Sequence, residues 1–102
     1  MTAYITGCVL YTNPENMPQI KSLFPPPFDP HQNGGGIVDL GYYGEVNISE
    51  FVELIGSLAP FIHDRGYVEM ENGECTWRYV FVSREYHEVA PVLTWPDFPD
   101  TA

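Results

Sequence analysis

A chain of 102 residues, of which 44% are apolar and 15% aromatic, suits one domain with a modest core and argues against disorder. Its net charge of −10, from 14 Asp and Glu against four Lys and Arg, argues against direct binding to nucleic acid or anionic lipid. Apolar runs are too short to cross a membrane, and the first residues do not resemble a signal peptide. We therefore expect a cytoplasmic protein with free, buried thiols at Cys8 and Cys75.

The N-terminal third of the chain predicts a strand followed by a short helix. Residues 2–11 alternate well enough for a first strand. "PENMPQIKSLF", residues 14–24, favours a short helix with Pro18 near its start, where a missing N–H is tolerated.

A loop and an interrupted strand are predicted next. "PPPFDPHQNGGG", residues 25–36, contains prolines and glycines that prevent regular structure, so we expect a long loop. Such loops are often functional, although a plain surface excursion is the alternative. "GIVDLGYYGEV" then predicts a strand that is bent or bulged at Gly41 and Gly44.

The main helix is predicted from about Asn47 to Arg65. Asn47 and Glu50 have the spacing of a capping box. Apolar residues then recur at helical spacing and form a broad buried stripe. Pro60 removes a helical hydrogen bond, so a kink or break is expected between residues 56 and 60. Gly66 is the expected left-handed terminator of the helix.

A β-hairpin is predicted around Asn72-Gly73, because this pair favours a two-residue type I′ turn. That turn would place Glu71 opposite Glu74 and Met70 opposite Cys75. The like-charge pair would cost about 0.2–1 kcal/mol. The face predicted to pack on the helix contains Val68, Met70, Cys75, Trp77, Tyr79 and Phe81.

A last strand is predicted from about Tyr86 to Trp95, at the edge of the sheet because it contains Pro91. Residues 96–102 are expected to be a loose tail. The whole chain, residues 1–102, is thus interpreted as a single acidic α+β domain. Its predicted architecture has two layers: a mostly antiparallel sheet of about four or five strands, with one main helix packed on one face.

No enzyme chemistry is predicted. His31, His63 and His87 fall in a loop, at a helix end and on a strand. None has a partner at the spacing of metal ligands except Asp29, two residues before His31. Both cysteines fall on predicted buried faces, which argues against a nucleophile. We expect no catalytic, cofactor-binding or metal-binding residue.

The chemistry that remains is binding to another protein. The hairpin tip gathers three glutamates, and exposed tyrosines are good anchors in protein interfaces. Solubility is the alternative explanation of the acidic charge. Trp95 is a further candidate anchor. The predicted partner-binding residues are Glu69, Glu71, Glu74, Glu45, Tyr42, Tyr43 and Tyr67.

Two motifs in the C-terminal half carry a resemblance. They are "LAPFI", from Leu58 to Ile62, and "GYVEMENGECTWRYVF", from Gly66 to Phe81, followed by an acidic-to-apolar strand. This half resembles a family of small uncharacterised proteins of bacteria, phages and other mobile elements. The resemblance implies an α+β fold and a mobile-element origin, and it implies no catalytic residue.

These observations favour an inhibitor that binds a host defence enzyme acting on nucleic acid, such as a CRISPR effector. Carboxylates on alternate strand positions lie about 6.6 Å apart and can occupy a basic groove built for phosphates. One alternative is an immunity protein that neutralises a toxin nuclease. Another is a small ligand-binding or enzymatic domain with its site under the 25–36 loop. A third is a housekeeping adaptor protein that has no catalytic role.

Overall fold

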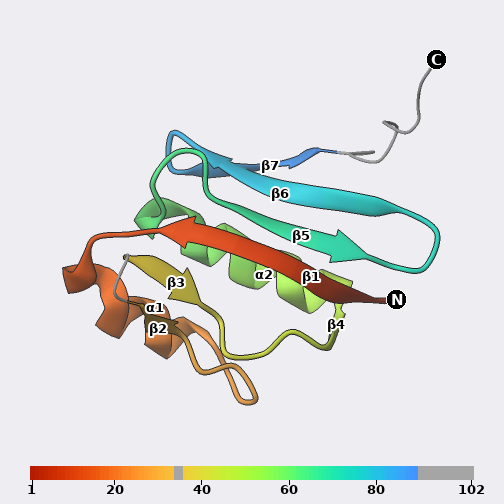
Figure 1. Cartoon of the computed structure of the whole chain (residues 1–102), viewed down its shortest axis with the longest axis horizontal. Helices are drawn as coiled ribbons and strands as arrows, with labels where there is room; N and C mark the ends of the chain where they lie inside the picture. The colour runs from red at the N-terminus through yellow and green to blue at the C-terminus, as the bar shows by residue number, and fades with distance from the viewer. Residues whose placement is uncertain (34–35, 90–102) are drawn as a thin grey trace.

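The computed structural model describes residues 1–33 and 36–89, which form one sheet and two α-helices (Figure 1). The helices are α1 (Met17–Leu23) and α2 (Ile48–Leu58), and short 3-10 turns occupy Pro14–Asn16 and Ala59–Phe61. The strands are β1 (Thr2–Tyr11), β2 (His31–Gln32), β3 (Ile37–Asp39), β4 (Glu45–Asn47), β5 (Tyr67–Glu71), β6 (Thr76–Val82) and β7 (Glu85–Val89).

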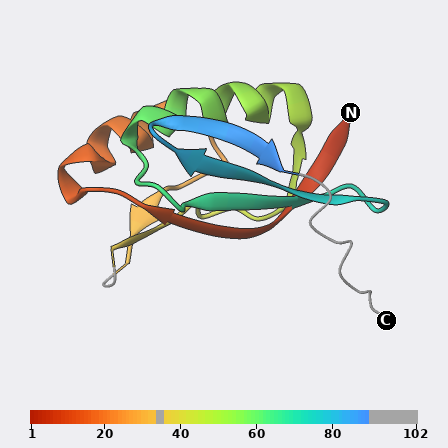
Figure 2. The same cartoon turned by 90° about the horizontal axis from the view of Figure 1, so that it is seen from above.

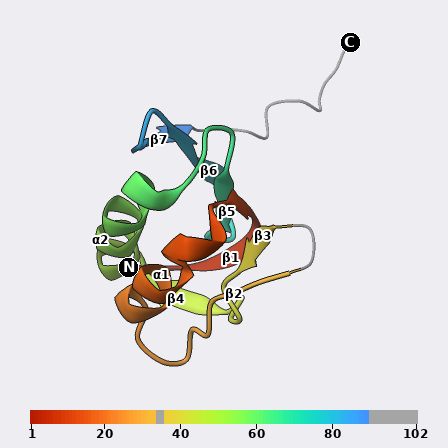
Figure 3. The same ribbon diagram turned by 90° about the vertical axis from the view of Figure 1, so that its left-hand side faces the viewer.

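The described strands form a seven-stranded antiparallel sheet in the order β2-β3-β1-β5-β6-β7, and β4 pairs with the start of β1. Both α-helices lie on one face of this sheet (Figure 2), and α1 contacts α2 (Figure 3). The predicted two-layer α+β fold is confirmed. The sheet has more strands than predicted, because residues 37–47 form two short strands and the 25–36 loop contributes β2.

A bulge in β1 changes which residues point toward the helices. Ile5 pairs with Met70 and Gly7 pairs with Glu69, so Thr6 is an extra residue between two registered positions. The buried residues of β1 are therefore Ala3 and Ile5 before the bulge and Leu10 after it. Strict alternation would have buried odd-numbered residues along the whole strand.

The start of α2 and the break near Pro60 agree with the prediction, but the helix does not continue to Arg65 as predicted. The Asn47 side-chain oxygen accepts a hydrogen bond from the Glu50 N–H at 3.1 Å. The α-helix ends at Leu58, and a 3-10 turn containing Pro60 follows. The predicted terminator is wrong, because Arg65 and not Gly66 has a positive φ, of 79°. Gly66 is needed for space instead, since a Cβ there would lie 2.8 Å from the Ile62 Cγ2 atom.

The predicted turn of the β5–β6 hairpin is also wrong. Residues 72–75 form a longer loop, in which the Asn72 side-chain oxygen accepts hydrogen bonds from the N–H groups of Glu74 and Cys75 at 2.9 and 2.8 Å. The register therefore shifts by two residues, and Glu71 faces Thr76 where Glu74 was expected. An even shift keeps each side chain on its predicted face of the sheet, but Cys75 lies in the loop and is exposed.

The type I′ geometry expected at residues 72–73 occurs instead in the next hairpin. Ser83 and Arg84 both have positive φ, 56° and 65°, and they join the paired residues Val82 and Glu85. Strand β7 is the last in the sheet order. The predicted continuation of this strand through Pro91 to Trp95, and the tail at 96–102, lie outside the described residues.

The core lies between the helices and the face of the sheet that they cover. Its centre contains Phe51, Ile55 and Leu58 from α2, which pack with inward residues of the central strands. No helix in residues 1–33 or 36–89 has the length and apolar character needed to span a membrane.

Candidate functional site

One face of the sheet has no helix over it among the described residues (Figure 2), and we call it the open face. Its side chains alternate with those of the core. Large apolar side chains are exposed here, with Tyr4 at 53% and Tyr11 at 38% accessibility. The open face includes Tyr4, Val9, Tyr11, Glu45, Tyr67, Glu69, Glu71, Thr76, Arg78, Val80, Val82, Glu85, His87 and Val89. Contiguous exposed aromatic and aliphatic groups often mark an interaction surface.

Two carboxylates flank a tyrosine on the open face. Tyr4 in β1 pairs with Glu45 of β4 on one side and with Glu71 of β5 on the other. Two strand spacings separate the glutamates, or about 10 Å between their Cα atoms. Glu45 accepts a hydrogen bond from the Thr2 hydroxyl at 2.7 Å, and Glu71 has no hydrogen bond or ion pair within the described part of the chain. Neither carboxylate is neutralised by a basic side chain there.

Glu69 has a different environment from its neighbour Glu71. Its carboxylate forms an ion pair with Arg78 at 3.0 Å and accepts a hydrogen bond from the Thr6 hydroxyl at 3.2 Å. The Arg78 guanidinium also lies over the Tyr67 ring, 4.0 Å from its centroid. Glu69 and Tyr67 are therefore engaged with Arg78, and a regular array of three free glutamates does not form.

The other predicted partner-binding residues lie outside this row. Glu74 is exposed in the loop at 72–75. Tyr43 is exposed between β3 and β4, and its hydroxyl donates to the Asp39 carboxylate at 3.2 Å. Tyr42 packs edge-on against Phe28, with ring centroids 5.3 Å apart, and its hydroxyl donates to the Glu45 backbone carbonyl at 2.9 Å.

Tyr4 is the residue of this surface that the sequence reasoning missed. The alternation in residues 2–11 carries the necessary signal, because it places Tyr4 out of phase with Ala3 and Ile5. The exposure of Tyr11 carries no such signal, because it depends on the bulge at Thr6.

The structure gives the two cysteines different chemistry. Burial raises the pKa of the Cys8 thiol to about 12, and the nearby Asp39 carboxylate contributes to that rise. Cys8 is therefore protonated at neutral pH and is a poor nucleophile. Cys75 is exposed. Within residues 1–33 and 36–89, no three His, Cys, Asp or Glu side chains are placed to hold a metal ion.

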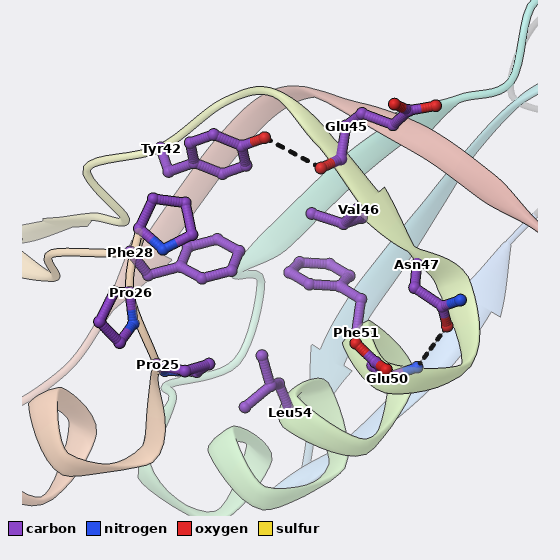
Figure 4. Close-up of a pocket in the computed structure, with 11 residues that line it drawn as sticks. Pro25, Pro26, Phe28, Tyr42, Glu45, Val46, Asn47, Glu50, Phe51 and Leu54 are labelled. Carbon is purple, nitrogen blue, oxygen red and sulfur yellow. Dashed lines mark hydrogen bonds between the residues drawn. The ribbon is translucent and has the colours of Figure 1, made fainter.

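A pocket of about 340 Å³ lies at the start of α2, beneath residues 25–30, which we call the proline-rich segment (Figure 4). The segment is fastened to the chain before β4, because the Asp29 N–H donates to the Leu40 carbonyl at 2.9 Å. Gly41 permits this approach, since it has a φ of 76° and a Cβ there would lie 2.6 Å from the Asp29 carbonyl oxygen. The pocket is lined by Pro25, Pro26, Pro27, Phe28, Tyr42, Glu45, Val46, Asn47, Glu50, Phe51 and Leu54.

Comparison of the chain with protein-family models, with curated proteins and with solved structures found no match. Two features of this molecule are candidate binding sites, the open face and the pocket.

Proposed function

We propose that this protein is an acidic inhibitor that binds, through its open face, the basic nucleic-acid-binding surface of another protein. The observation that carries the proposal is the row of Glu45, Tyr4 and Glu71 across three adjacent strands. A tyrosine supplies a large contact area, and the carboxylates on each side of it supply negative charge.

Charge complementarity explains why such a surface selects its partner. A groove that binds phosphates is lined with Lys and Arg, and these groups attract carboxylates in the same way. The acidic surface also accelerates the encounter with a basic partner and disfavours direct contact with nucleic acid. On this open face the Arg78 charge is already engaged by Glu69, so it does not offset Glu45 or Glu71.

We infer the class of partner from the mobile-element origin that the motifs at residues 58–62 and 66–81 are expected to imply. It favours a host enzyme of defence that acts on nucleic acid, such as a CRISPR effector, within the bacterial cytoplasm. An immunity protein that neutralises a toxin nuclease would use the same kind of contact. The genes beside the coding sequence distinguish these two versions of the proposal.

Affinity capture from a bacterial lysate tests the proposal. The wild-type protein and a Glu45→Lys, Glu71→Lys variant serve as baits, and short duplex DNA serves as competitor. We expect the wild-type protein to retain a basic nucleic-acid-binding protein that DNA displaces and that the variant does not retain. A captured protein that binds both baits equally, or that binds DNA and bait together, would contradict the proposal.

A second candidate function is the binding of a small ligand. The pocket beneath the proline-rich segment favours it, because its volume lies within the range of ligand sites.

A further inference from the structure

The pocket beneath the proline-rich segment has a lining that is mostly aromatic and aliphatic. Phe28 is its central ring, with a centroid 5.3 Å from that of Tyr42 and 6.1 Å from that of Phe51. Phe51 is only 1% exposed and lies behind Phe28. Phe28 and Tyr42 therefore supply the accessible rings of the cavity in Figure 4, and prolines and Leu54 complete the wall. An aromatic ring presents negative electrostatic potential at its face, so such a wall favours a cation that has lost its water.

The polar groups of the pocket also favour a positively charged ligand. None of the lining residues is Lys, Arg or His. The Tyr42 hydroxyl donates to the Glu45 carbonyl, and the Asn47 side-chain oxygen accepts from the Glu50 N–H (Figure 4). The Glu50 carboxylate has no hydrogen bond or ion pair among the described residues, so it remains available as an acceptor for a ligand.

Two other classes of ligand suit this pocket less well. An anion would be attracted by the start of α2, but Glu50 lies in the first helical turn and would repel it. In addition, the Ile48 N–H already donates to the Met1 carbonyl at 3.0 Å. A hard divalent metal ion requires about six to eight oxygen ligands, which a wall of rings and prolines does not provide.

We propose that this pocket binds an organic ammonium ion with a compact apolar body. The charged nitrogen lies between the Glu50 carboxylate and the rings of Phe28 and Tyr42, and the apolar body lies against Leu54 and the prolines. A volume of about 340 Å³ accommodates both parts, since one water molecule takes only about 30 Å³. This site is independent of the partner proposed for the open face.

The test is a titration of the ¹⁵N-labelled protein, followed by NMR, with three probes that share a benzyl group. Benzyltrimethylammonium is the cation, benzyl alcohol the neutral compound and phenylacetate the anion. We expect the cation to shift the amide signals of Phe28, Tyr42 and Glu50. It should bind roughly two- to thirtyfold more tightly than benzyl alcohol, which is the range that cation–π contacts provide.

Matched variants test whether the Glu50 carboxylate attracts the cation and whether the Tyr42 ring contacts it. Glu50→Gln should weaken binding of the cation by up to about fivefold, as expected for a partly exposed ion pair. Glu53→Gln is the control, because it removes the same charge from the same helix outside the pocket. Tyr42→Phe should preserve binding and Tyr42→Leu should weaken it, because the ring and not the hydroxyl contacts the cation.

Three results would overturn the proposal. The neutral or anionic probe could bind as tightly as the cation, the signal changes could fall outside the pocket, or Glu50→Gln and Glu53→Gln could have equal effects. Glu71→Lys on the open face should leave binding of the cation unchanged. Failure of this titration would therefore not affect the function proposed for the open face, and the reverse also holds.

Discussion

The two faces of the β5–β6 hairpin are built from alternate residues of the same strands, yet they differ in almost every physical property. On the covered face, Val68, Met70, Tyr79 and Phe81 are at most 1% exposed. On the open face, Glu69 and Arg78 pair in partial contact with water, and Glu71 is exposed and unpaired in the described structure. The difference indicates that one face determines stability and that the other can change its charge at little cost to the fold.

The largest expected effect is the loss of a large side chain from the covered face. Trp77 is 7% exposed and faces Met70 across the hairpin. We expect Trp77→Ala to lower the free energy of unfolding by about 3–5 kcal/mol, because it leaves a cavity that the core fills only in part. Equilibrium urea unfolding measures this loss. A variant as stable as the wild-type protein would show that the covered face does not hold the fold.

A second test uses the buried thiol of Cys8. Cys8 has a pKa of about 12 in the folded protein against an ordinary value of 9.0. The folded state therefore retains a proton that the unfolded state releases, and stability falls as the pH rises from about 9 toward 12. We expect the free energy of unfolding to fall by about 1–2 kcal/mol between pH 8 and pH 10.5, since each unit of pKa difference corresponds to about 1.4 kcal/mol.

Urea unfolding at several alkaline pH values measures the slope of the free energy of unfolding against pH. Cys8→Ala should reduce it, although burial also raises the pKa of Tyr79, so part of the slope should remain. Cys75→Ala is the matched control, because Cys75 is exposed, and it should leave the slope as it is. Equal slopes in the wild-type protein and in Cys8→Ala would contradict the assignment of a buried, protonated thiol.

The smallest expected effect separates two glutamates of the open face. Glu69→Gln removes the ion pair with Arg78 and should cost about 0.5–1 kcal/mol. Glu71→Gln removes an unpaired charge and should change the free energy of unfolding by less than about 0.5 kcal/mol. Unfolding of the two variants in parallel gives the comparison directly. If both substitutions cost the same, the two carboxylates do not differ as their contacts indicate.

Most local features of the fold were predictable from the sequence, but one local turn and the features that depend on distant residues were not. The Asn47 cap and the break at Pro60 depend on residues within a turn or two, and both were predicted. The turn at residues 72–75 was not, because the Asn72 side chain binds two backbone N–H groups and lengthens the loop. Strand β3 lies within the strand predicted at residues 36–46, but β2 was not predicted, because it lies in a segment whose prolines and glycines favour a loop.

The same distinction applies to the open face. Strand alternation is a local pattern, and it is sufficient to place Tyr67, Glu69 and Glu71 on one face of the hairpin. The position of Tyr4 between Glu45 and Glu71 depends on the pairing of β1 with both β4 and β5, which follow it at a long distance in the chain. The engagement of Glu69 by Arg78 depends on the register of the hairpin, and the predicted register was wrong.

The central claim is that acidic residues of the open face bind a basic partner while the covered face supplies most of the stability of the fold. Its most direct test reverses Glu45 and Glu71 of the open face to Lys, together with Glu74 of the neighbouring 72–75 loop. Glu69 stays in place, because it is paired with Arg78. The partner is the basic protein retained in the capture experiment. Its affinity for the wild-type and reversed proteins is measured by calorimetry, beside a thermal melt of each.

We expect the affinity to fall by more than tenfold in the reversed protein, because close charge pairs across an interface couple by about 1.5–7 kcal/mol. Affinity for the wild-type protein should also weaken as the ionic strength rises from about 0.1 M to 1 M, where the screening length shortens from about 10 Å to 3 Å. The melting temperature should be nearly the same for both proteins. An affinity that changes neither with salt nor with the triple reversal would contradict the account.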